Sequence, residues 1–467
     1  MGRPRLHRAA RICALGQAIA LLALLPGCIA YSARPLPASY AGLTAQTLRE
    51  ERAHWSQHSV ETVPIDAPLS MAEFVRAALA HSPELHAQRQ QKMVAAAQQA
   101  ATKAIADPQI SLGLDHPTSA QQGLVSAFSV GLGYDIQSLL THGAAVDSAN
   151  AAIAQTQLDT LWQEWQIAQQ ACMAYVRYIA EQQSIELLRA AAIDSERTAS
   201  AAQRALQRAD IDATAANADL AAASDSAARL NQLAQQHAAT EHELKALLGI
   251  DSDWMPALQA PPAAAAFDSG QVVELLPRAP QQRPDLLALQ AGYASEEAKL
   301  RKEILMQFPA FSIGINRARD TSAVYTTGVS VAMTLPLFTG NRPAIASESA
   351  TRDQLYAEYQ ARLAATAIDS RRLLELQRLI EQRRAQLALA VPPLEQAVQH
   401  AAHAFANGDI DTRARIAARQ AWLAARIEQI DIERAGWENH IALATLLGLP
   451  TALSLPTQHE APPDEIQ

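Results

Sequence analysis

Apolar and small polar residues alternate in two separate regions of the chain, at about 108–137 and about 309–337. The apolar positions of the first region are Ile110, Leu112, Leu114, Phe128, Val130, Leu132 and Tyr134. Those of the second region are Phe311, Ile313, Ile315, Tyr325, Val329, Val331 and Met333. A period of two residues is typical of β-strands with one apolar face. Because a gap divides each region, the pattern predicts two strands in each.

The opposite face of these strands carries Ser, Gly, Thr, Asn and Asp. A soluble sandwich would more often turn bulky residues inward and charges outward. An apolar face opposite small polar residues is typical of strands that separate lipid from a water-filled lumen. A small soluble sheet covered by helices remains the alternative.

Long stretches with helical character follow each strand region. No glycine or proline occurs from Ala144 to Leu248. A second stretch of helical character covers 345–447, although it contains Pro392, Pro393, Gly408 and Gly436. We expect a helical hairpin in each, with the second turning at Gly408, because glycine is the usual helix terminator. The expected arms are about 144–208 and 213–248 in the first hairpin, and about 345–407 and 412–447 in the second. Such arms are far longer than the mean helix of about 11–12 residues. They are therefore expected to pack side by side as coiled-coil-like hairpins.

The same landmarks occur twice in the same order, which predicts an internal duplication. Pro83 and Pro108 match Pro284 and Pro309 at one spacing, and Leu-Leu-Gly motifs close both halves. Each half opens with a shorter, proline-interrupted helix. In the first half Ser70 and Glu73 have the spacing of a capping box, and a break is expected near Ser82-Pro83. In the second half breaks are expected at Pro277, Pro280 and Pro284. The expected organisation is a signal peptide at 1–27, a lipidated extended leader at 28–69, repeats at 70–260 and 261–450, and a disordered tail at 451–467.

Four strands are too few to enclose a channel, since even eight-stranded barrels are filled by their own side chains. An open sheet edge cannot lie in lipid, because unpaired N–H and C=O groups cost several kcal/mol each there. If the strands are in a membrane, several chains must share one barrel. Three chains would supply twelve strands.

The N-terminal segment has the features of a secretion signal. Four arginines precede an apolar stretch that ends Leu25-Pro26-Gly27-Cys28, close to a bacterial lipobox although Pro26 departs from it. This predicts cleavage before Cys28 and lipid, such as palmitate, on its sulfur. Ile29 favours sorting to the outer membrane. An ordinary signal peptide with an incidental cysteine is the alternative.

Charge and motifs narrow the functional classes. The net charge of −9 and the absence of a Lys/Arg cluster argue against nucleic-acid binding. The chain contains no phosphate loop, nucleophile elbow or zinc-protease motif. The closest helical histidine pair, His400 and His403, lacks nearby carboxylate ligands, so we assign no metal site and no cofactor. Nothing in the sequence indicates an enzyme.

Four aspartates, Asp210, Asp212, Asp409 and Asp411, lie at the predicted hairpin tips. Aspartate near a helix N-terminus commonly caps backbone N–H groups. In an assembly of three chains these carboxylates would also surround a pore mouth, where they would attract cations and gate the opening. The two roles are compatible.

Several motifs resemble those of one family. They are Arg283-Pro284-Asp285-Leu286, Phe308-Pro309-Ala310-Phe311-Ser312, Leu335-Pro336-Leu337-Phe338-Thr339-Gly340, Val391-Pro392-Pro393 to Gly408-Asp409-Ile410, and the terminal Leu-Leu-Gly. With these residues the chain resembles the TolC-like outer-membrane efflux channels, specifically the lipoproteins that serve resistance–nodulation–division pumps. The resemblance covers about 70–450.

The resemblance implies a mainly α-helical homotrimer with membrane β-structure. Each chain would add four strands to a twelve-stranded outer-membrane barrel, and its long hairpins would form a periplasmic α-barrel with an iris-like tip. The tip would dock a periplasmic adaptor joined to an inner-membrane pump, and the trimer would passively conduct drugs or metal ions. A type I secretion exit duct and a non-conducting coiled-coil envelope scaffold are the alternatives. The exported compound is not indicated by the sequence.

Overall fold

The computed structural model describes residues 31–57, 67–118, 123–336 and 338–449. The chain divides into two units, 1–41 and 42–467. In the first unit, residues 31–41 form neither helix nor strand. The predicted signal peptide, Cys28 and the tail at 451–467 lie outside the described residues.

The segment predicted as an extended leader, 28–69, contains a helix, so that prediction is wrong in part. Helix α2 spans Ala45–Gln57, and the Thr44 hydroxyl accepts a hydrogen bond from the Thr47 N–H at 3.2 Å near its start. Helices α3 (Met71–His81) and α4 (Pro83–Lys103) follow, separated at Ser82 as the Ser-Pro pair predicts. Helix α2 forms where the leader packs against α3.

The four predicted strands form one antiparallel sheet in the order β1-β2-β3-β4. They are β1 (Gln109–Asp115), β2 (Ala127–Asp135), β3 (Ala310–Arg319) and β4 (Tyr325–Thr334). The two β-hairpins, β1-β2 and β3-β4, thus pair with each other through β2 and β3, although about 180 residues separate these two strands in the chain. Strands β1 and β4 are the two edges.

The long helices begin earlier than predicted. Helix α5 spans Ile136–Gln207, not 144–208, and starts directly where β2 ends because the Asp135 carboxylate accepts from the Gln137 N–H at 3.0 Å. Ile136 is therefore helical rather than the end of a strand. Helix α10 spans Arg342–Asn407, starting three residues before 345, with Pro343 in its first turn, where proline is tolerated.

The return arms match the prediction closely. Helix α6 spans Ala213–Leu248 and α11 spans Thr412–Leu447, and each ends at a left-handed glycine, Gly249 and Gly448. Before β3 the chain forms α7 (Ser269–Leu275), a 3-10 turn η1 (Leu276–Arg278), α8 (Ala279–Gln282) and α9 (Pro284–Leu305). The predicted breaks at Pro277, Pro280 and Pro284 fall at these boundaries.

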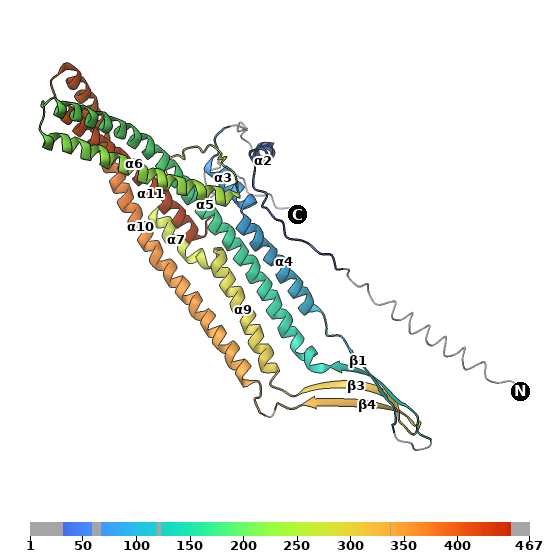
Figure 1. Ribbon diagram of the computed structural model, residues 1–467. Helices are drawn as coiled ribbons and strands as arrows, with labels where there is room; N and C mark the ends of the chain where they lie inside the picture. The colour runs from blue at the N-terminus through green and yellow to red at the C-terminus, as the bar shows by residue number, and fades with distance from the viewer. Residues whose placement is uncertain (1–30, 58–66, 119–122, 337, 450–467) are drawn as a thin grey trace. The chain divides into compact units, whose positions relative to one another are not determined.

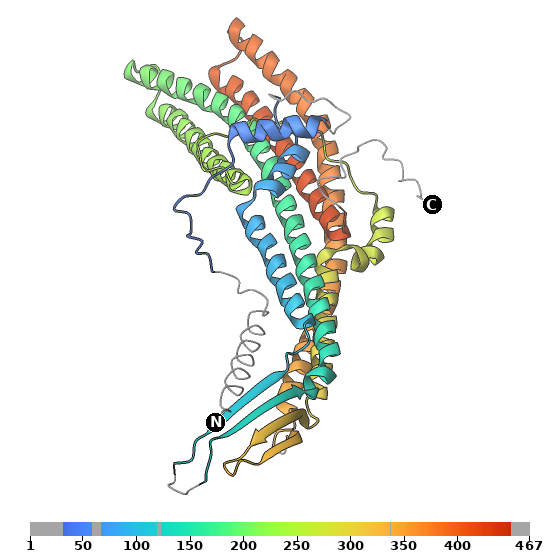
Figure 2. The same cartoon turned by 90° about the vertical axis from the view of Figure 1, so that its right-hand side faces the viewer.

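In the unit 42–467 the helices that carry the strands lie side by side in the order α4-α5-α9-α10. Helix α6 packs along the far part of α5, α11 packs along α10, and α11 also contacts α5 (Figures 1 and 2). All four strands continue from one end of this row, and both hairpin tips lie at the other end (Figure 1). None of the helices in the described ranges is both long and apolar enough to span a bilayer.

The main hydrophobic core lies where α3, the middle of α5 and the end of α6 meet. Phe74, Tyr175, Leu244 and Leu248 are among its largest fully buried members, and alanines fill the gaps between the backbones. Cys172 belongs to this core, and burial raises the pKa of its thiol to about 12. The thiol is therefore a packing group rather than a nucleophile.

A buried ion pair joins four helices near the start of α9. Arg283 donates to both carboxylate oxygens of Asp285, at 3.0 and 2.7 Å, and both side chains are buried. The guanidinium also donates to Thr366 of α10 and to the Leu446 carbonyl of α11, and it lies over the Trp162 ring of α5. The Arg-Pro-Asp motif thus stabilises the row of helices.

Candidate channel surfaces

The sheet register places all the large apolar side chains of the strands on one face. Ile110 pairs with Leu132, which pairs with Ile315, which pairs with Val329. Nearly all of this face is exposed: Leu112, Val329 and Val331 are 76%, 74% and 67% accessible. In the described residues no helix covers it, which argues against the alternative of a helix-covered sheet. Such a large exposed apolar surface marks a contact with lipid or with another chain.

The other face of the sheet is lined by small and polar side chains. A methyl group at Gly131 would lie 2.5 Å from the Ser111 hydroxyl oxygen. The glycine in β2 therefore leaves room for the serine side chain of the neighbouring strand β1. The same relation holds between Gly113 and Ser129. These residues make a polar surface of low relief, which suits contact with water better than packing against a helix.

The outer edges of the sheet have no partner strand in the part of the chain that the structure describes. Strands β1 and β4 each pair on one side only. Their outward N–H and C=O groups therefore need either water or the strands of another chain.

Two of the four tip aspartates cap helices. The Asp212 carboxylate accepts from the Ala215 N–H at 2.7 Å, and the Asp411 carboxylate accepts from the Ala414 N–H at 2.8 Å. Asp210 instead pairs with Arg208 at 3.0 Å, and both groups are exposed. The capping role that the sequence predicts is thus present at the second aspartate of each tip, and the first aspartates face solvent.

The two tips turn with the same backbone geometry but with different residues. Gly408 has φ of 80°, and Ala209, at the matching position, has φ of 60°. This left-handed conformation costs a residue with a Cβ roughly 1–2 kcal/mol. Both turns are closed alike, with the N–H of Asp210 bonded to Ala205 O and that of Asp409 to Ala404 O.

We expect Ala209→Gly to stabilise the first tip and Gly408→Ala to destabilise the second, each by about 1 kcal/mol. The change should be local, because each turn closes on its own helix end. Amide hydrogen exchange at the last turns of α5 and α10 measures it, and the two variants should move protection in opposite directions. Equal and unchanged protection in both would contradict the strain argument.

Arginines of α11 tie the two hairpins together, a contact that sequence reasoning missed. Arg419 forms an ion pair with Asp194 of α5. Arg413 lies 3.8 Å from the Asp219 carboxylate of α6 and donates to the Ala215 carbonyl at 3.3 Å. Arg415 instead contacts its own hairpin, where it lies over the Phe405 ring of α10. Arg413 and Arg419 could be seen in the sequence, but the carboxylates that they contact lie about 200 residues away.

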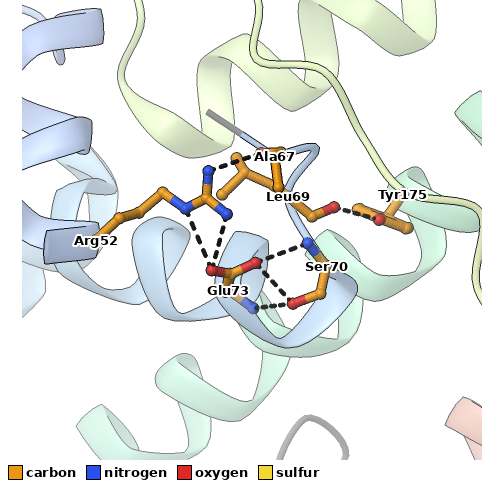
Figure 3. Close-up of polar contacts among 6 residues, drawn as sticks. All are labelled: Arg52, Ala67, Leu69, Ser70, Glu73 and Tyr175. Carbon is orange, nitrogen blue, oxygen red and sulfur yellow. Dashed lines mark hydrogen bonds and ion pairs between the residues drawn. The ribbon is translucent and has the colours of Figure 1, made fainter. Parts of the chain in front are cut away.

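The leader is held by a polar cluster at its junction with α3 (Figure 3). Two guanidinium nitrogens of Arg52 donate to Glu73 Oε1, at 3.2 and 3.1 Å, and a third donates to the Ala67 carbonyl at 2.7 Å. Glu73 also accepts from Ser70, which completes the predicted capping box. Tyr175 donates to the Leu69 carbonyl at 2.7 Å. Helix α2 is thereby fixed to the helical body.

A cavity of about 420 Å³ with a mixed polar and apolar lining lies among α4, α5, α9 and α10, close to the strands. Its walls include Gln98, Ser148, Lys299 and Glu348. A hydrogen bond to buried Glu296, together with desolvation, raises the pKa of Glu348. The described residues contain no group of three or more His, Cys, Asp or Glu side chains positioned to bind a metal ion.

No protein-family model matches the chain, and no curated protein matches its sequence. Solved structures do match. The Campylobacter jejuni CmeC outer membrane channel is similar with a TM-score of 0.67 at 13% identity, over 91% of this chain and 94% of that one. The Neisseria gonorrhoeae MtrE outer membrane channel, solved in its open state, gives 0.64 at 14% identity, over 82% and 89%. CusC, described as forming a transmembrane channel, gives 0.65 at 15%, over 81% and 92%.

These likenesses, which extend over most of both chains, show the fold. The chain has the fold of the TolC-like outer-membrane efflux channels: four antiparallel strands joined to long helical hairpins. The resemblance read from the sequence motifs is confirmed at the level of the fold.

Proposed function

We propose that three copies of this chain form an outer-membrane channel of a tripartite efflux system. Each copy contributes β1–β4 to a twelve-stranded barrel, while the α4-α5-α9-α10 row contributes to a twelve-helix periplasmic tunnel. Lipid on Cys28 anchors each leader. A periplasmic adaptor docks at the hairpin tips and an inner-membrane pump supplies the energy, so this chain conducts drugs or metal ions passively.

The sheet carries this proposal. It has an exposed apolar face, a small polar face and two unpaired edges, β1 and β4. Pairing β4 of one copy with β1 of the next satisfies both edges and closes a barrel. The apolar face then contacts lipid and the polar face lines a water-filled lumen. The residues of α4 and α10 form the corresponding edges of the helical row.

The proposed repeats, 70–260 and 261–450, fit the same assembly. Each supplies a helix, two strands and a long hairpin, so a trimer of duplicated units has six similar building blocks around its axis. The duplication accounts for the pairing of β2 with β3. This pairing joins the first repeat to the second, in the same way that β4 of one chain is proposed to pair with β1 of the next.

Ion conductance in planar bilayers tests the function. Purified protein is expected to carry current, and the current should rise when the tips are released by mutation. A trimer that carries no current even with released tips would support the scaffold alternative. Co-purification of a resistance–nodulation–division pump rather than an ATP-driven secretion pump with the channel separates efflux from a type I secretion duct.

The Arg413 and Arg419 contacts are expected to hold the tunnel tip closed. Partly exposed ion pairs contribute ~0.2–1 kcal/mol each, so removing both shifts the closed–open balance by roughly twofold to thirtyfold. Arg413→Ala with Arg419→Ala should therefore raise channel open time in single-channel recordings. Arg426→Ala is the control, because its hydrogen bond to Gln429 stays within α11. An open time unchanged by the double variant would exclude the restraint.

The tip aspartates are expected to favour cations. Changing Asp210, Asp212, Asp409 and Asp411 to Asn removes twelve carboxylates from a trimer, while asparagine still caps helices. The reversal potential in a salt gradient should move toward zero. Asp268→Asn is the matched control, since Asp268 caps α7 away from the tips. Unchanged reversal potentials in the fourfold variant would refute a selectivity role.

A further inference from the structure

The apolar face of the sheet ends in two arginines. Alternation places Arg317 and Arg319 on the same face as Ile313 and Ile315, and both lie toward the end of β3 that is remote from the helices. Arg319 pairs with Phe128 on one side and Tyr325 on the other, while Arg317 pairs with Val130 and Thr327. Charged residues thus replace apolar ones at one rim of an otherwise apolar surface.

Arg319 is held in place by aromatic rings. Its guanidinium lies 5.6 Å from the centre of the Phe128 ring and 6.0 Å from that of Tyr325, and these two rings pack edge to face at 6.2 Å. One nitrogen donates to the Ser126 carbonyl, whereas the buried Nε has no hydrogen-bond partner among the described residues. The aromatic pair thus holds the Arg319 cation at the rim, beside the exposed Arg317.

The charge of these arginines is not neutralised within the described chain. No ion pair joins either of them to a carboxylate of the described residues, and Arg317 is exposed. The neighbouring carboxylate of Asp320 accepts instead from the N–H groups of Ser322 and Val324 in the β3–β4 turn. The two arginines, whose Cα atoms are about 7 Å apart along one strand, therefore leave positive charge at the rim that an anion can neutralise.

We propose that Arg317 and Arg319 bind the phosphate headgroup of an anionic lipid in the outer leaflet. This rests on the proposed function, which places the rim remote from the helices at the outer membrane surface. Arginine donates two parallel hydrogen bonds to phosphate, and Phe128 and Tyr325 suit the interface between headgroups and acyl chains. The acyl chains lie against Ile313 and Ile315. The arginines thus contact the charged headgroup, and the isoleucines next to them contact the apolar part of the same lipid.

Lipid retention tests this site. Channels reconstituted in equal amounts of phosphatidylglycerol and phosphatidylcholine are examined by native mass spectrometry, which counts each lipid bound per assembly. A basic residue near an anionic surface contributes roughly 1 kcal/mol, so Arg317→Gln should lower the preference for phosphatidylglycerol about fivefold. Arg317→Lys should keep most of it. Arg317 is the better target, because Arg319 also contacts Ser126 and the rings and its loss could disturb the turn.

Arg371→Gln is the control, since it removes the same charge from an exposed position of α10. It should leave the lipid ratio unchanged. Conductance is recorded for every variant. A conducting channel whose lipid ratio is the same with and without Arg317 overturns the lipid site alone. A wild-type chain that neither inserts nor conducts overturns the proposed function and the site together.

Discussion

Replacing Val329 with arginine is expected to prevent stable assembly of the channel in a membrane. Val329 lies in the middle of β4, is 74% exposed and pairs with Ile315 on the apolar face. In water an arginine at such a position is tolerated, but at the midplane of a bilayer it costs ~2–4 kcal/mol per chain. Every chain of the proposed trimer carries the substitution. The yield of heat-resistant oligomer extracted from outer membranes measures the effect.

The adjacent residue provides the control. Ser330 lies on the opposite, small polar face, beside Gly314. Ser330→Arg should assemble normally and lower the single-channel conductance, because the side chain would extend into the lumen. The two variants differ by one position and by the face they alter. If both assembled equally well, the apolar face of the sheet would not contact lipid.

Replacing Asp285 with alanine is expected to destabilise the helical body by ~3–5 kcal/mol. Asp285 is 7% exposed and accepts two hydrogen bonds from Arg283, which is 6% exposed. Removing the carboxylate leaves the guanidinium charge buried among Thr366, the Leu446 carbonyl and the Trp162 ring. Chemical unfolding followed by helical circular dichroism should show a lower midpoint.

Two further variants separate the charge effect from a general packing defect. Arg283→Met combined with Asp285→Leu removes both charges and should recover much of the loss, because a buried pair can be replaced by apolar side chains. Glu274→Ala breaks the exposed Arg278–Glu274 pair and should have little effect. A double variant as unstable as Asp285→Ala would show that the orphaned charge is not the cause.

The periodicity of the sequence predicted the elements well for physical reasons. Strand residues alternate over a full strand length, and both return arms end at glycine, so local preferences and tertiary structure agree. The starts of α5 and α10 were placed too late. A strand that passes directly into a helix leaves no loop residues, because Asp135 is both the last residue of β2 and the N-cap of α5.

The candidate site was predicted less completely. The capping of α6 and α11 by Asp212 and Asp411 follows from local sequence, and so does the box between Ser70 and Glu73. The contact of Arg52 with Glu73 was missed, and with it helix α2, because the leader is rich in proline and polar residues. Its helix is stabilised by packing on α3 rather than by its own apolar pattern.

The sequence alone determined the order, type and sidedness of the elements, because alternation, helical runs and terminating glycines are local properties of the chain. Only the tertiary structure decided which distant residues meet. Arg419 with Asp194 and Arg319 with Phe128 are examples. Their pairing depends on how far each helix is rotated about its axis and on the register between β2 and β3. Packing of the whole chain sets both quantities, and no local pattern records them.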